Sequence, residues 1–396
     1  MENSSFETLP QDLQMEILSR LPLKILGKCI CVSKKWASLI RGEDFKRFYL
    51  SRSMKRPRVM FMARRYTSEP PEPEMWWFHS VYQEQRCDPG SSHDIEALFH
   101  SVYQEENTLL SSGQQQLRIP LEPKGSYISR PVQGLICLQL RTKVAICNPC
   151  TKKIRTLPEI QVPEPAHIYT FFGYDEAKNV FKVLCITRFG TRELRRFDEN
   201  TITKYEVCTM GEKSWRPITC KDGHSPETEG LFKGGVLYYA ADLYSDSTRV
   251  IMSFNVGSED FSVIELPKGV DFSSIGWNLV NYKGNIALSS CDDYENGVLQ
   301  LWVRKMGVWL IKIIEIHSWK ETVEGLKYYF RGTIGTGELV FTEYFYFENE
   351  SPYIVLYYDK KAKNLRRFEI EELTEGHCVE TFLDHVDSTW LICDEV

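Results

Sequence analysis

The 396-residue chain lacks an uninterrupted apolar run of about 18 residues, the length that a membrane-spanning helix requires. Its first residues, MENSSFETLPQD, are polar and acidic and do not resemble a secretory signal peptide. Strong charge of either sign is also missing, because 48 basic and 54 acidic side chains give a net charge of −6. This balance gives no reason to expect a nucleic acid or a membrane as partner. We expect a protein of the cytoplasm, the nucleus or both, in which the 12 cysteines stay reduced.

Catalytic motifs are scarce. The eight histidines follow no metal-ligand spacing, and no Gly-x-Ser-x-Gly elbow occurs. Gly332, Gly335 and Gly337 lack the following Lys-Ser/Thr pair and helix of a phosphate-binding loop, so we interpret them as turn and bend glycines. Asp384-His385 has no serine or cysteine partner in a motif, and we expect this histidine to be a core group. We therefore predict no enzyme, no metal site and no cofactor.

The only Cys-x-x-Cys motif is Cys147-Asn-Pro-Cys150. A zinc site would need a second pair at matching spacing, and a redox site would need a helix start after a strand. Neither is present. Asn-Pro is a turn pair, so we interpret this segment as a hairpin with two incidental cysteines.

What the chain does contain is a dense apolar stretch from Leu9 to Ile40, in which 17 of 32 residues are hydrophobic. Leu13, Ile17 and Leu21 recur at helical spacing, and Pro22 cannot continue a helix interior, so a first helix should end near Leu21. Two further short helices are expected. Their apolar faces carry Leu26, Cys29 and Ile30, and then, after Ser33 as N-cap, Trp36, Leu39 and Ile40.

Three such helices cannot bury this much apolar surface among themselves, because units below roughly 40 residues usually need a metal, disulfides or a partner. The stretch contains no metal-ligand pattern. The simplest solution is that the helices interlock with another polypeptide. The alternative is a three-helix unit that packs only on the rest of the chain.

The spacing of Leu-Pro pairs, a Cys, a Val-Ser and a late Trp in this stretch resembles an F-box. The resemblance implies that the helices dock onto a Skp-type adaptor, which links them to a cullin–RING ubiquitin ligase. The residues expected to fill the adaptor's apolar groove are Leu9, Pro10, Ile17, Leu18, Leu21, Pro22, Leu26, Cys29, Val32 and Trp36.

The next part of the chain is irregular. Residues 46–65 hold eight basic side chains and no acid, and we favour a solvated helix face that runs into a strand with Val59–Met62 as its core over a nucleic-acid patch. A short duplication follows, in which the segment FHSVYQE occurs at residues 78–84 and again at residues 99–105. We expect one copy to belong to the fold and the other to an inserted loop. We assign residues 1–48 to the helices and residues 49–116 to a connecting region.

From about residue 130 the chain is periodic. Apolar strands recur from residues 134, 181, 234, 284 and 337, and each is followed by a hairpin: 144–158, 205–218, 251–267, 299–313 and 354–370. A repeat near 50 residues with three or four strands is typical of a β-propeller of kelch-like period. We count five modules. The strands before residue 120, or the carboxyl-terminal segment VETFLDHVDSTWLIC, should supply a sixth blade or close the ring.

This region also resembles the plant F-box-associated domain. The residues that carry the resemblance are Tyr103–Glu106, Pro131–Cys137, Cys147–Pro149, Leu157-Pro158 and Asp384–Val386. The resemblance implies an α+β multidomain fold class, and we expect a small all-α F-box followed by an all-β propeller-like domain at residues 117–392, with a β-sandwich as the alternative.

The function implied is that of a substrate receptor, in which the β-domain binds a target protein for ubiquitination. The sequence does not name this target. The alternatives are an interaction scaffold that destroys nothing and, less favoured, a propeller enzyme.

Overall fold

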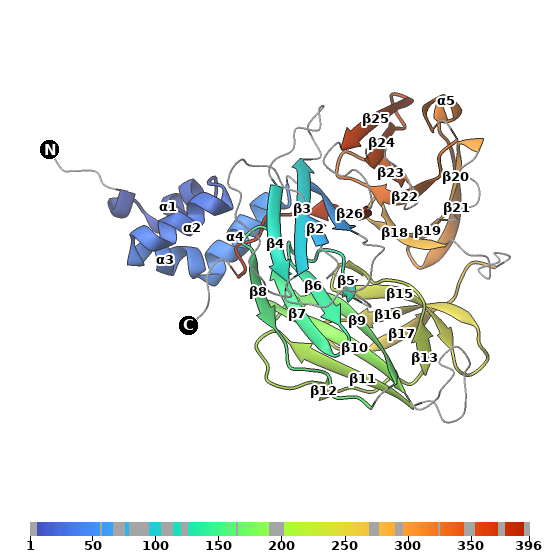
Figure 1. Cartoon of the computed structure of the whole chain (residues 1–396), viewed down its shortest axis with the longest axis horizontal. Helices are drawn as coiled ribbons and strands as arrows, with labels where there is room; N and C mark the ends of the chain where they lie inside the picture. Colours follow the sequence, from blue (N-terminus) through green and yellow to red (C-terminus); the bar gives the residue numbers. More distant parts are fainter. Residues whose placement is uncertain are drawn as a thin grey trace.

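The computed structural model describes residues 6–55, 58–65, 76–78, 95–103, 114–119, 126–163, 165–189, 202–268, 277–289, 296–323, 325–343, 353–370 and 377–391. Figure 1 shows a helical domain beside a larger β-domain. The helical domain contains the short turn η1 (Phe6–Thr8) and helices α1 (Gln11–Leu18), α2 (Leu23–Val32), α3 (Lys34–Arg41) and α4 (Glu43–Ser53). None of the described helices has the length and apolarity that crossing a membrane requires.

The first helix is shorter than expected. It ends at Leu18 rather than near Leu21, and a tighter turn follows, in which Leu21 N donates to Leu18 O. The residue before a proline is disfavoured in the α-helical backbone conformation, so Pro22 already excludes Leu21 from the helix. The third helix is capped as predicted, because the Ser33 hydroxyl accepts a hydrogen bond from Trp36 N.

A fourth helix joins the three that we expected within residues 1–48. Helix α4 follows Gly42 directly, begins with Glu43 and Asp44 in its first turn, and runs to Ser53. Acidic residues at a helix amino terminus are favourable because they complement the helix dipole. Phe45 and Tyr49, one turn apart, pack into the core of α1–α3. These three helices therefore bury much of their apolar surface against a fourth.

The periodic part of the sequence forms five sheets, each built from one continuous stretch of chain. The first two contain β5 (Ser126–Ile128), β6 (Ile136–Leu140), β7 (Lys143–Asn148), β8 (Lys153–Thr156), and β9 (Ala166–Asp175), β10 (Val180–Phe189), β11 (Ile202–Thr209), β12 (Arg216–Pro217). The third contains β13 (His224–Pro226), β14 (Leu231–Lys233), β15 (Val236–Leu243), β16 (Arg249–Asn255) and β17 (Phe261–Ile264). The last two contain β18 (Asn278–Tyr282), β19 (Asn285–Ser289), β20 (Val298–Lys305), β21 (Val308–Glu315), and β22 (Tyr328–Thr333), β23 (Leu339–Glu343), β24 (Tyr353–Asp359), β25 (Asn364–Ile370).

Helix α5 (Trp319–Val323) lies between the last two sheets in the chain. All five sheets are antiparallel, and the five predicted modules are confirmed. A sandwich has two face-packed sheets, so the β-sandwich alternative is not supported.

A further sheet joins the two ends of the β-domain. It contains β1 (Arg58–Arg65), β2 (Trp76–Phe78), β3 (Ile95–Tyr103), β4 (Gln114–Ile119) and β26 (His377–His385). Both segments proposed for ring closure take part, because β26 pairs antiparallel with β1 from Arg65↔His377 to Arg58↔His385. Strands from the expected connecting region 49–116 thus belong to a propeller sheet. Their place in this sheet follows from the pairing of strands that are distant in sequence, and no local pattern predicts it.

The predicted strand core Val59–Met62 is confirmed, since all four residues lie in β1 and are fully buried. In the duplication, Phe78 lies in β2 and Phe99–Tyr103 lies in β3. Residues 79–84 and 104–105 of the two copies lie outside the described residues, as do residues 104–106 of the Tyr103–Glu106 motif.

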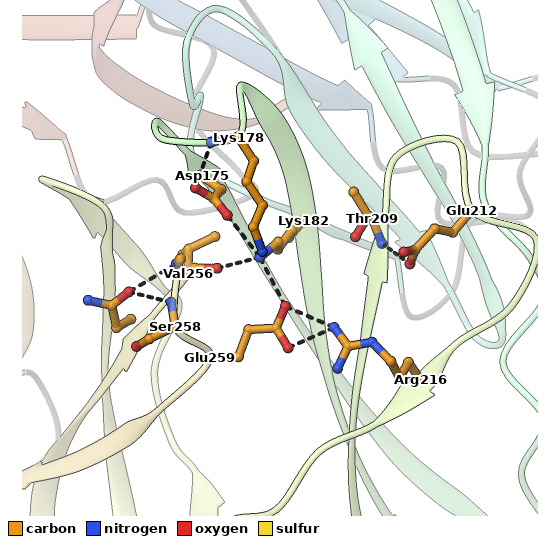
Figure 2. Close-up of polar contacts among 11 residues, drawn as sticks. Asp175, Lys178, Lys182, Thr209, Glu212, Arg216, Val256, Ser258 and Glu259 are labelled. Carbon is orange, nitrogen blue, oxygen red and sulfur yellow. Dashed lines mark hydrogen bonds and ion pairs between the residues drawn. The ribbon is translucent and has the colours of Figure 1, made fainter.

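Neighbouring sheets are tied by buried charge as well as by apolar packing. Figure 2 shows Lys182 of β10 between Asp175 of its own sheet and Glu259 in the β16–β17 turn of the next. Its Nζ lies 3.0 Å from Asp175 Oδ2 and 2.9 Å from Glu259 Oε1, and donates to Val256 O at 2.8 Å. Arg216 donates to both oxygens of Glu259. The buried ammonium is therefore fully paired, as a buried charge must be.

Candidate functional site

The helical domain divides the predicted docking residues into two groups. Leu18, Leu26 and Cys29 are buried in its own core, together with Ile40 and Phe45. In this structure their side chains hold the helices together rather than face solvent. They could affect docking only by positioning the exposed residues.

The remaining predicted residues reach the surface. Pro10, Ile17, Pro22 and Val32 are exposed, and Leu9, Leu21 and Trp36 are half-buried. Val32 is 74% exposed at the end of α2, although it is an apolar residue. A single exposed valine is ordinary, but three more exposed apolar side chains lie on α1 and α2.

Two of these exposed apolar residues, Leu13 on α1 and Ile25 on α2, were not predicted as docking residues. Leu13 lies one turn before Ile17 on α1, and Ile25 lies two turns before Val32 on α2. The helical spacing of Leu13 was visible in the sequence. Which side of the helix faces solvent was not, because both sides of α1 and α2 carry apolar residues. We name the set Leu13, Ile17, Ile25 and Val32 the apolar docking rows.

The segment that contains the apolar docking rows is basic, and its basic side chains are exposed. Residues 9–42 contain two acids, Asp12 and Glu16, and six bases, which are Arg20, Lys24, Lys28, Lys34, Lys35 and Arg41. Glu16 is also paired, since its Oε1 accepts hydrogen bonds from Arg20 at 2.7 Å and Arg52 at 2.9 Å. The side-chain hydrogen bonds from Arg20 and then Arg52 lower the pKa of this carboxyl. The surface is therefore suited to an acidic partner.

A groove of about 450 Å³ lies between α1, α3 and α4. Leu9, Met15 and Leu39 supply its apolar wall, and Lys35 and Asp44 its rim. The Gln14 side chain, which is almost fully buried, donates to Leu9 O at 2.7 Å. This bond fixes the chain that enters α1, so that the predicted Leu9-Pro10 pair is held in a defined place.

The helical domain is joined to the propeller by specific contacts. Glu43 of α4 accepts a hydrogen bond from Asn179, which in turn accepts one from Tyr174. Lys46 Nζ lies 4.4 Å from the ring centroid of Trp390 in the carboxyl-terminal segment. Such a contact places a cation on the electron-rich face of the indole ring. The helices are thus docked on the β-domain.

The hairpin predicted at the Cys147–Cys150 motif is confirmed by the pairing of β7 with β8, and Cys150 in its turn contributes to the same junction. Its side chain packs against the helical core, and its thiol donates to Asp387 Oδ1 at 3.3 Å. Sγ also lies 3.5 Å from His385 Nε2, and Arg58 pairs with Asp387 Oδ2 at 2.5 Å. Cys147 is fully buried in the neighbouring sheet core.

The chemistry of this cluster is structural. Burial, followed by the charge of Asp387, raises the pKa of the Cys150 thiol well above its ordinary value, so the nucleophilic thiolate is disfavoured. Burial, and then the charge of Arg58, lowers the pKa of His385 to about 3. The expected core role of His385 is confirmed, for its side chain is 1% exposed. No metal-ligand group of three or more His, Cys, Asp or Glu side chains occurs among the described residues.

A second hollow lies in the β-domain. A cavity of about 520 Å³ is lined by residues of several sheets, among them Arg130, Glu229, Lys233, Arg331 and Glu380. Arg130 Nη2 donates to Leu279 O at 3.0 Å. The lining carries both signs of charge at close range. It therefore has no single electrostatic preference for a ligand.

The sequence of the chain is similar to known protein families and to known plant proteins. The model of the F-box domain matches residues 6–48, and the model of the F-box associated beta propeller domain matches residues 85–386. The chain is 51% identical to "Putative F-box protein At1g70970" of Arabidopsis thaliana, over 99% of this chain and 100% of that protein. It is 50% identical to "Putative F-box protein At1g70960" of the same plant, over 99% and 100%. A more distant relative, "F-box/kelch-repeat protein At3g04660" of Arabidopsis thaliana, is 31% identical over 96% and 92%.

Proposed function

Because the chain belongs to the family of F-box proteins that carry an F-box associated beta propeller domain, we propose that it is the substrate-recognition subunit of a Skp–cullin–F-box ubiquitin ligase. Helices α1 and α2 bind a Skp-type adaptor, which connects the chain to a cullin–RING ligase. The propeller binds a target protein. The chain itself carries out no chemistry and acts by holding the target near the ubiquitin-loaded enzyme. It works in the cytoplasm, the nucleus or both.

The observation that carries the proposal is the exposure of the apolar docking rows. Leu13, Ile17, Ile25 and Val32 are between 38% and 74% exposed, although the sequence places them in strongly apolar helices. Burying such side chains against a partner contributes about 25 cal/mol per Å² of apolar surface. An adaptor groove that covers them would also meet the surrounding basic side chains, which favours an acidic adaptor surface.

The junction between the two domains supports the receptor role. A receptor must present its target at a reproducible distance from the ligase, and a loose tether would lower the effective concentration of target lysines. The contacts of Glu43, Lys46 and Cys150 with the propeller oppose free rotation of the helical domain.

The test is binding of the purified full chain to a Skp-type adaptor. The informative variant is Ile17→Asp with Val32→Asp, which changes two exposed side chains and no core residue. We expect stoichiometric binding by the wild type and at least about a tenfold weaker affinity for the variant, since charges would be buried against an apolar groove.

The matched control is Ile202→Asp, which places the same change at an apolar residue of the propeller that is 53% exposed. It should bind the adaptor like the wild type. Adaptor binding that is unchanged in the Ile17→Asp, Val32→Asp variant, with folding intact by circular dichroism, would exclude this docking surface.

A second candidate function is a scaffold that binds the adaptor and a partner without causing destruction. The docking surface is the same in both cases, so adaptor binding does not separate them. Turnover of a bound target, measured for the wild type and for the Ile17→Asp, Val32→Asp variant, separates them. A receptor causes target turnover that the variant abolishes, whereas a scaffold causes no target turnover in either form.

A further inference from the structure

A group of exposed apolar side chains lies on the β20–β21 hairpin. Among the described residues outside the helical domain, the exposed large hydrophobic side chains are Ile202 and five residues of this hairpin. The five are Met306, Val308, Leu310, Ile311 and Ile313, and each is more than half exposed. A concentration of this kind on a short segment indicates an interaction surface rather than scattered surface residues.

Strand β21 is the outer strand of its sheet, which has the order β18-β19-β20-β21. Met306 and Gly307 have φ of 50° and 82° and form a two-residue turn, so the flanking pair Lys305↔Val308 exchanges both backbone hydrogen bonds. In an antiparallel pair of strands, every second pair of opposite residues is joined by hydrogen bonds. At the other end of the hairpin, Ile316 N donates to Gly297 O at 2.8 Å, as this alternation requires.

The alternation fixes where the backbone groups of β21 point. Even-numbered residues direct their N–H and C=O groups at β20. Trp309, Ile311 and Ile313 direct theirs away from it. This edge is therefore a template for one more strand.

The outer edges of the other four single-stretch sheets are protected. Strands β8 and β17 are four residues long, and β12 is a two-residue strand that contains Pro217. Strand β25 is seven residues long but carries Arg366, Arg367 and Glu369. Short length, proline and charge are the usual means of blocking an edge. Strand β21, with eight residues and an apolar surface, has none of these apart from Lys312 and the terminal Glu315.

The exposed side chains lie on both faces of the sheet. On one face, Trp309 Nε1 donates a hydrogen bond to the carbonyl oxygen of Glu265, which directly follows β17 of the preceding sheet. On the other face, Lys312 Nζ lies 5.2 Å from the ring centroid of Tyr282. Since side chains alternate, Ile311 and Ile313 share the face of Trp309, and Leu310 shares that of Lys312. A docked helix would cover one face only. An added strand would place its own side chains beside both rows.

Charge identifies the kind of strand. Residues 298–315 carry Arg304, Lys305 and Lys312 against Glu315, a local charge of 3 − 1 = +2, whereas the whole chain carries −6. A second copy of this chain that pairs through the same edge would bring the basic residues of two hairpins together, which is unfavourable. An extended partner with apolar and acidic residues fits this edge better.

We propose that β21 is the edge onto which an extended, acidic and apolar segment of the target protein adds as a further strand. Backbone hydrogen bonds to Trp309, Ile311 and Ile313 supply affinity, and the rows on the two faces supply selectivity. The identity of the occupant as a ubiquitination target rests on the proposed function. The addition of a strand to the β21 edge does not depend on that function.

The test uses the full chain and a fluorescent eight-residue peptide of alternating isoleucine and glutamate, which matches the length of β21. Two further peptides carry N-methyl groups, one at alternate residues and one at every residue. A strand on a single edge needs only alternate N–H groups, so we expect the first methylated peptide to bind and the second to lose affinity by about tenfold or more.

The protein variant Ile311→Lys with Ile313→Lys adds charges to the exposed edge and should also weaken binding by about tenfold. Ile202→Lys is its matched control and should bind the peptide like the wild type. Both variants should retain adaptor binding, because the change lies far from α1 and α2.

Three results would overturn the proposal: no binding of the parent peptide, equal binding of the fully methylated peptide, or a dimer of the wild type in sedimentation that the β21 variant abolishes. The last would assign the edge to a second copy of the chain. Loss of adaptor binding by the wild type would instead contradict the proposed function and leave the peptide result standing.

Discussion

Asn148 and Trp390 lie 242 residues apart in the chain, yet Asn148 Nδ2 donates a hydrogen bond of 2.6 Å to Trp390 O. The same nitrogen donates to Ser388 O at 2.8 Å, and Asn148 Oδ1 accepts from Cys150 N at 2.9 Å. A fully buried amide at the end of β7 therefore anchors the carboxyl-terminal segment that follows β26. Gly134 allows the close approach of this segment, since a Cβ there would lie 2.4 Å from Val386 O.

Asn148→Ala should destabilise the fold by about 2–4 kcal/mol, because it leaves the buried carbonyl groups of Ser388 and Trp390 without their donor. Urea unfolding of the full chain measures the change. The matched control is Asn364→Ala at an exposed position of β25, which should change stability by less than about 0.5 kcal/mol. An Asn148 variant as stable as this control would contradict the anchoring role.

Leu26→Ala should destabilise the helical domain by about 2–5 kcal/mol, because Leu26 is completely buried and its removal leaves a cavity. Val32→Ala, at a residue that is 74% exposed, should leave stability nearly unchanged. Thermal unfolding followed by the helical signal distinguishes the two. Equal losses for both variants would mean that the assignment of buried and exposed apolar residues on α2 is wrong.

Lys182→Met should cost about 3–5 kcal/mol at neutral pH, because it leaves Asp175 and Glu259 without their buried cation. Burial alone would raise the pKa of both carboxyls, but the hydrogen bond from Lys182 and the other donors outweigh it and lower the pKa of each below 3.8 and 4.5. The stability these carboxylates contribute is present above about pH 4.5 and is lost as pH falls through their folded pKa values.

The deficit of the Lys182→Met variant should accordingly be large at pH 7 and smaller near pH 3, as measured by urea unfolding at both values. Lys178→Met is the control, since the Lys178 side chain is exposed and only its backbone N–H bonds Asp175. A deficit that does not depend on pH would show that the ion pairs contribute little and that packing of the lysine stem dominates.

His385 should make the protein acid-sensitive. Its pKa is about 3 in the fold, below the ordinary 6.5, so the unfolded chain takes up a proton that the folded chain does not. Stability should fall by about 1.4 kcal/mol for each pH unit below 6.5, down to about pH 3. His385→Gln cannot be protonated and should flatten this dependence between pH 6.5 and 4.5, where the carboxyls near Lys182 stay ionised.

The control for this prediction is His167→Gln, since His167 is exposed at the start of β9. It should leave most of the slope in place. The measurement is the free energy of unfolding at several pH values, and an identical slope in wild type and His385→Gln would exclude His385 as the sensor.

The features that depend on local spacing could be predicted from the sequence. The helical recurrence of Leu13 and Ile17, the prolines and the Ser33 cap predicted the helices, and the strands after residues such as Gly134 and Gly284 predicted five sheets. These succeed because periodicity and turn residues act over a few neighbours. Even the edge at β21 left a signal, an apolar hairpin strand with little alternation.

The remaining features depend on how distant parts of the chain pack together. The pairing of β1 with β26, the role of Cys150 beside His385 and Asp387, and the packing of α4 on the first three helices join residues that are distant in sequence or whose partners no local pattern names. The same holds for exposure: Leu26 and Val32 are both apolar residues of α2, yet one is buried and the other is free for a partner. Which side of an all-round apolar helix faces solvent depends on what packs against the other side.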